Sequence, residues 1–80
     1  MDYYKKIKTS GTSTLTYYYA RDNNDLYIFG PSPTDSTKWI YTFQTESPDV
    51  IALILTGATT VNRSELDAPI NQIQTILSSI

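Results

Sequence analysis

Histidine and cysteine are both missing from this chain of 80 residues. Without them the chain cannot form a Cys/His zinc site, a histidine-based catalytic triad, a thiol nucleophile, a disulfide or an imidazole pH switch. Seven of the eight acidic residues, all but Asp2, lie in predicted turns, loops and helix ends, where capping and turn formation account for them. We therefore predict no catalytic residues, no metal and no cofactor, and a protein that is not an enzyme.

Long hydrophobic runs and a strong charge of one sign are missing as well. The longest apolar run, Val50 to Leu55, is far too short to span a bilayer, and no apolar signal segment follows Met1. We expect a soluble, cytoplasmic protein with no membrane partner. The net charge of −2 does not provide the positive field of a dedicated nucleic-acid binder, so a nucleic-acid partner is not favoured.

Tyrosine is abundant, with seven copies, and the aromatic residues precede residue 44, whereas aliphatic residues dominate afterwards. This division predicts one domain over 1–80, with a β half at about 1–44 and a helical half at about 45–80. The fold class is α+β: a small antiparallel β-meander of three to four strands, followed by two short helices packed on one face.

Alternating β-branched and aromatic residues predict strands at 13–20, 26–29 and 38–44, and a fourth at 3–9. Asn23 and Asn24 suit the centre of a type I′ turn, because asparagine tolerates a positive φ. A two-residue turn there places Tyr18 opposite Phe29 and Tyr19 opposite Ile28.

Two segments of the second half carry helix signals. Ser47, Pro48 and Asp49 favour a helix start and Gly57 a helix stop, although the apolar run 50–56 is also compatible with a buried strand. A second helix at about 68–79 begins after a cap at Asp67, so that Pro69 falls in its first turn. An apolar stripe with helical spacing supports it: Leu66, Ile70, Ile73, Leu77 and Ile80.

The predicted hairpin is apolar on both faces. Leu15, Tyr17, Tyr19, Leu26 and Ile28 share one face, and Tyr18, Ala20, Tyr27 and Phe29 share the other. The third strand adds to this second face either Ile40 or the set Trp39, Tyr41 and Phe43. Because two short helices can cover one face, we expect the second face to form an interface, and we assign to it Tyr18, Tyr27, Phe29 and Ile40.

A small chain without a disulfide or metal gains stability by association. We therefore predict a non-enzymatic module that binds another protein, itself or both, and acts by occupying a surface. Its size and missing chemistry are typical of small accessory regulators or of inhibitors carried by phages and mobile elements. The alternative is a nucleic-acid-associated accessory protein that uses the Tyr/Lys segment 3–8, whose aromatic rings could stack on bases.

Overall fold

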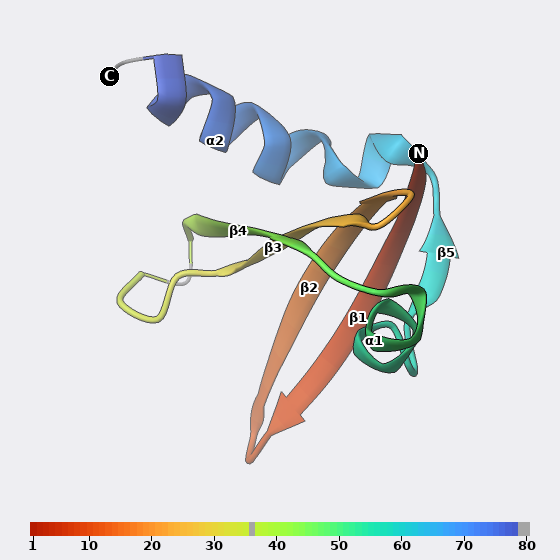
Figure 1. Cartoon of the computed structure of the whole chain (residues 1–80). Helices are drawn as coiled ribbons and strands as arrows, with labels where there is room; N and C mark the ends of the chain where they lie inside the picture. The colour runs from red at the N-terminus through yellow and green to blue at the C-terminus, as the bar shows by residue number, and fades with distance from the viewer. Residues whose placement is uncertain (36, 79–80) are drawn as a thin grey trace.

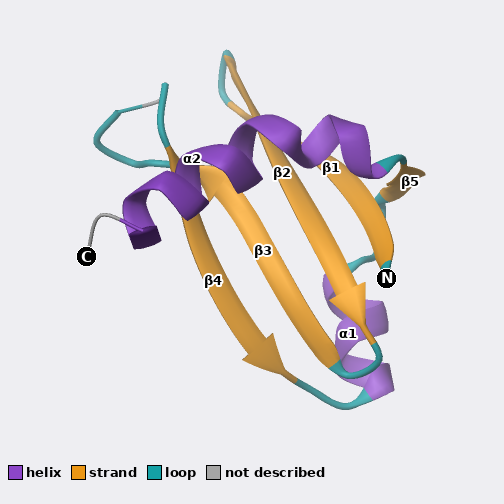
Figure 2. Ribbon diagram, turned by 90° about the horizontal axis from the view of Figure 1, so that it is seen from above, coloured by secondary structure: helices purple, strands orange, loops and turns teal. Residues whose placement is uncertain are grey.

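The structure, a computed structural model, describes residues 1–35 and 37–78, the side chains of residue 10 and residues 75–78 excepted. Five antiparallel strands form one sheet in the order β4-β3-β2-β1-β5, and two helices accompany it (Figure 2). The elements along the chain are β1 (Asp2–Ser10), β2 (Ser13–Asp22), β3 (Asp25–Pro31), β4 (Trp39–Thr45), α1 (Pro48–Ile54), β5 (Thr59–Val61), a 3₁₀ turn (Arg63–Leu66) and α2 (Asp67–Ser78).

The β2–β3 hairpin confirms the predicted turn and register. Asn23 has a φ of 56°, and Tyr18 lies opposite Phe29 as Tyr19 lies opposite Ile28. The preceding hairpin turns at Gly11, whose φ of 63° few other residues adopt without strain. All four predicted strands are present, including the one at the N-terminus, which is a full strand of 9 residues.

The fifth strand was not predicted. Thr59–Val61 follows α1 and pairs with the start of β1, with Tyr3 opposite Val61 and Lys5 opposite Thr59. It is only 3 residues long, too short for an alternating pattern to reveal it. Because β5 pairs with Tyr3, Tyr4 and Lys5 at the outer edge of β1, the residues after 45 add a strand to the sheet as well as supplying the helices.

Helix α2 packs across one face of the sheet, which we call the α2 face (Figures 1 and 2). Leu66 and Ile73 contact Ala20 and Phe29 in the main buried cluster, and Pro69 is also buried. The helix runs from Asp67 to Ser78, and Pro69 lies in its first turn as predicted. The predicted cap at Asp67 is wrong, because Asp67 has helical backbone angles and directly continues the 3₁₀ turn that precedes α2. Ile70 packs against the same cluster, whereas the side chain of Leu77 and residue Ile80 lie outside the described residues.

Helix α1 starts as predicted. Ser47 is its N-cap and accepts a hydrogen bond from the Val50 N–H, Pro48 occupies the first turn, and Gly57 follows the helix with a φ of 83°. The helix interpretation of 50–56 is therefore correct, and the strand alternative is not.

We expected both helices to pack on the same face of the sheet, but they pack on opposite faces. Helix α1 lies against the opposite face, which we call the α1 face (Figure 2). There Ile51 is fully buried, as is Leu26 of β3, and the Lys6 ammonium donates a hydrogen bond to the Ile54 carbonyl. The apolar run is not buried all round, because Leu53 is 74% exposed. The seven residues of α1 bury the side of the helix that carries Ile51, and the side that carries Leu53 faces solvent.

Truncating α2 at its buried side tests this packing. Ile73→Ala is expected to lower the free energy of unfolding by roughly 2–5 kcal/mol, because it leaves a cavity beside Phe29 and Leu66. Gln74→Ala, at an exposed position on the same turn, should change it by less than about 0.5 kcal/mol. Urea denaturation of the two variants measures both values, and equal losses would contradict the packing.

Candidate protein-binding surface

The residues predicted to form an interface are divided between the two faces. Tyr18, Tyr27 and Phe29 share the α2 face, as the register requires, whereas Ile40 lies opposite Gly30 on the α1 face. Phe29 is only 5% exposed and belongs to the core beneath α2. The face assigned as open is therefore the one that α2 crosses, and the third strand adds Trp39, Tyr41 and Phe43 to it.

Helix α2 covers only part of this face. Trp39, near the start of β4, packs against the buried cluster and against the Tyr18 ring, with ring centroids 5.6 Å apart. Further along β4, Tyr41 is 39% exposed and Phe43 is 49% exposed. Their rings contact Tyr27 of β3, at centroid distances of 6.1 Å for Tyr41 and 5.0 Å for Phe43. We call Tyr27, Tyr41 and Phe43 the β4 aromatic patch.

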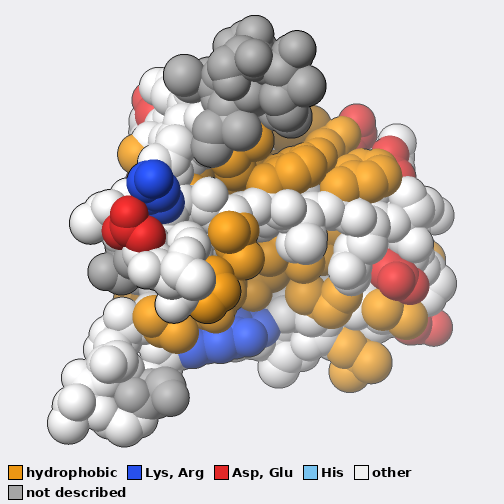
Figure 3. Space-filling model, turned by 90° about the vertical axis from the view of Figure 1, so that its left-hand side faces the viewer, with side chains coloured by type: hydrophobic (Ala, Val, Ile, Leu, Met, Phe, Trp, Pro, Cys, Tyr) orange, Lys and Arg blue, Asp and Glu red, His pale blue; other side chains and the backbone are white. Residues whose placement is uncertain are grey.

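A hollow of about 340 Å³ adjoins the β4 aromatic patch between α2 and the sheet. Tyr27 and Tyr41 line it from the sheet, and Ile70 and Ile73 line it from the helix. Arg63 contributes a charged side chain. Figure 3 views the left-hand side of Figure 1, where β4 begins, and there hydrophobic side chains extend across the middle of the surface.

The α1 face has an open part as well. Tyr17 lies against Gly30, where an added Cβ would come within 2.7 Å of the tyrosine ring, so this glycine makes room for the ring. Beside it, Ile40 is 46% exposed, and Leu15 and Pro33 help to line a shallow hollow next to the loop that follows β3. Glycine in the strand thus serves a close aromatic contact rather than a bend.

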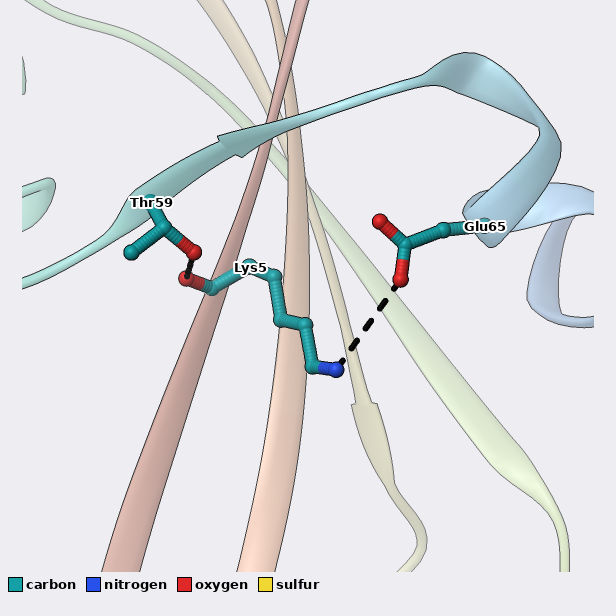
Figure 4. A network of polar contacts seen from close by, with 3 residues as sticks. All are labelled: Lys5, Thr59 and Glu65. Carbon is teal, nitrogen blue, oxygen red and sulfur yellow. Dashed lines mark hydrogen bonds and ion pairs between the residues drawn. The ribbon is translucent and has the colours of Figure 1, made fainter.

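The lysines of the N-terminal strand have intramolecular partners. Lys8 lies over the Tyr17 ring, 4.8 Å from its centroid, and Lys6 lies over the Tyr19 ring. The Lys5 ammonium is 3.9 Å from a Glu65 carboxylate oxygen, and the hydroxyl of Thr59 donates to the Lys5 carbonyl (Figure 4). The Tyr/Lys segment is therefore built into the sheet and its flanks.

The acidic residues have local partners at several positions. Asp25 accepts a hydrogen bond from the Thr45 hydroxyl, and Asp67 pairs with Arg63 one helical turn earlier. Two hydrogen bonds from Thr37 lower the pKa of Asp35. Within residues 1–35 and 37–78, no group of three or more His, Cys, Asp or Glu side chains is placed to hold a metal ion.

The β4 aromatic patch was missed as a site because it depends on strand order. The sequence places Tyr41 and Phe43 on one strand but does not show that this strand is outermost, or that α2 crosses near its start. One of the two arrangements considered from the sequence does lead to this patch. It is the one in which the third strand adds Trp39, Tyr41 and Phe43, and not Ile40, to the face of Tyr18 and Tyr27.

No protein-family model, curated protein or solved structure matches the chain. Among the described helices, none has the length and apolar character needed to cross a membrane.

Tyr19 should make the stability of the fold depend on pH in the alkaline range. Burial, with a smaller contribution from Tyr17, raises the pKa of Tyr19 above its ordinary value of 10.0. The folded state thus holds this proton more tightly than the unfolded chain, and the resulting stability is present below that value and lost as pH rises through the folded-state pKa. Urea denaturation at a series of alkaline pH values should show a shallower decline for Tyr19→Phe than for the wild type. An unchanged slope would contradict this account.

Proposed function

We propose that the protein is a non-enzymatic, cytoplasmic protein-binding module that acts as a regulator or inhibitor by covering part of a partner's surface. The β4 aromatic patch carries this proposal. It supports binding because Tyr41 and Phe43 remain exposed beside an apolar hollow instead of being covered by α2.

The chemistry of the patch favours a protein partner. Exposed apolar groups gain roughly 25 cal/mol for each Å² that a partner buries. Tyrosine and phenylalanine are enriched at protein interfaces, since their rings supply large contact areas and the tyrosine hydroxyl tolerates residual water. Ring contacts with Tyr27 restrain both exposed side chains before binding, which lowers the entropy lost on association.

Nucleic-acid association through segment 3–8 is the second candidate, and the cation–aromatic pairs Lys6–Tyr19 and Lys8–Tyr17 are the observation in its favour. These same contacts, and the Lys5–Glu65 pair, satisfy the lysines within the fold. The salt dependence of binding separates the two functions. Phosphate contacts weaken steeply as salt rises, whereas contacts of the β4 aromatic patch should persist.

Replacement of an exposed ring by a charge tests the patch. Phe43→Asp should retain the fold, since the ring is half exposed, and should reduce partner capture by tenfold or more because a carboxylate must be desolvated in the interface. Tagged wild type and variant are compared by quantitative mass spectrometry of proteins captured from the native host's extract.

Leu53→Asp is the matched control. Leu53 is the most exposed of the large apolar side chains in the described part of the chain, and it lies on α1, on the other face of the sheet. This variant should capture the same proteins as the wild type. Retention of the partner by Phe43→Asp, with its fold verified by circular dichroism, would overturn the proposal.

A further inference from the structure

The outer edge of β4 is unprotected by the usual means. Exposed strand edges invite pairing with other chains, and natural proteins shield them with charges, proline, bulges or very short strands. Strand β5, at the other edge of the sheet, is short, with 3 residues. Strand β4 has 7 residues, Trp-Ile-Tyr-Thr-Phe-Gln-Thr, with no charge and no proline, and its pairing with β3 runs without a bulge.

Hydrogen bonds just beyond the ends of β4 show which of its backbone groups point outward. The Ser32 N–H donates to the Lys38 carbonyl, and the Glu46 N–H donates to the Asn24 carbonyl. Both pairs continue the β3–β4 register, so even-numbered residues from 38 to 46 direct their N–H and C=O groups toward β3. The odd-numbered residues, Trp39, Tyr41, Phe43 and Thr45, therefore direct theirs away from the sheet.

The first of these outward groups is already occupied. The Trp39 N–H donates to the Gln72 side-chain oxygen of α2 at 2.6 Å, which agrees with the assigned direction. In the described part of the chain, no hydrogen bond from another element reaches the outward N–H and C=O groups of Tyr41 and Phe43. The aromatic side chains of these two residues are exposed as well, so the backbone and the side chains are available together.

The charges at the two ends of β4 favour a second copy of this chain as the occupant. Lys38 immediately precedes the strand and Glu46 immediately follows it. In an antiparallel pair of two β4 strands, the lysine end of each copy meets the glutamate end of the other. A parallel pair would instead bring like charges together at both ends. We infer that two copies associate through antiparallel β4–β4 pairing.

The charge complementarity also sets the register. With Lys38 opposite Glu46 of the second copy, Tyr41 lies opposite Phe43 and the two Thr42 residues face each other at the two-fold axis. Tyr41 of each copy then forms a hydrogen-bonded pair with Phe43 of the other copy. In each pair the two residues exchange both backbone N–H···O=C bonds. The aromatic rings of the two copies form cross-strand pairs on the α2 face, and the two sheets become one continuous sheet.

This inference deepens the proposed function, on which it rests for the assignment of β4 as the strand that meets other proteins. The proposed dimer and the proposed function can be overturned separately. A monomeric wild type overturns the second copy as occupant and leaves capture by the β4 aromatic patch to be decided by Phe43→Asp and Leu53→Asp.

Analytical ultracentrifugation of the full chain over micromolar to millimolar concentrations provides the test. The wild type should show a reversible monomer–dimer equilibrium. Phe43→Ala and Phe43→Pro both lose the ring, but only proline removes the outward N–H, and it removes no bond to β3. Each copy loses the bond from its residue 43 N–H to the Tyr41 carbonyl of the other copy, so the dimer loses two hydrogen bonds. Dimerisation of Phe43→Pro should therefore be roughly 30-fold weaker than that of Phe43→Ala.

A charge exchange at the strand ends tests the register without proline. Lys38→Glu should weaken the dimer about tenfold, because it places two carboxylates together at each end, and adding Glu46→Lys should restore the affinity. The inference is overturned by a wild type that stays monomeric throughout. It is also overturned by a dimer on which Lys38→Glu has no effect, or one that the second substitution does not rescue.

Discussion

The packing of α2 and the preceding 3₁₀ turn against Phe29 and Ala20 forms the main buried cluster of the molecule. The chain has no disulfide, so it must gain its stability from burial, and Leu66 and Ile73 bury the centre of the α2 face. One helix of 12 residues cannot also cover the far end of β4. The exposure of Tyr41 and Phe43 therefore follows from where α2 crosses the sheet, and the proposed binding surface is a consequence of the core.

Local signals in the sequence predicted much of the fold. Asn23 tolerates the positive φ of a tight turn, and a two-residue turn leaves one register for the hairpin, so the pairing of Tyr18 with Phe29 followed directly. Ser47 and Pro48 likewise marked the start of α1, because capping depends on neighbouring residues. These features need no knowledge of what packs against them.

The parts that escaped prediction depend on contacts between distant residues. An alternating strand offers two apolar faces, and nothing local decides that α2 takes the face of Phe29, so this residue was expected at an interface and lies in the core. Strand β5 exists because β1 presents an edge 54 residues earlier, as the Thr59–Lys5 contact shows. The outermost position of β4, which makes Tyr41 and Phe43 candidates for binding, is also a property of the assembled sheet.

The proposed dimer requires that the outer edge of β4 be free in the monomer and occupied on association. Residue-resolved amide hydrogen exchange at low and high protein concentration tests it most directly. In dilute solution the Thr42 N–H, which faces β3, should exchange slowly, and the N–H groups of Tyr41 and Phe43 should exchange quickly. At high concentration these two should become protected while Thr42 changes little. Slow exchange of Tyr41 and Phe43 in dilute solution, or their continued fast exchange where the protein is associated, would contradict the account.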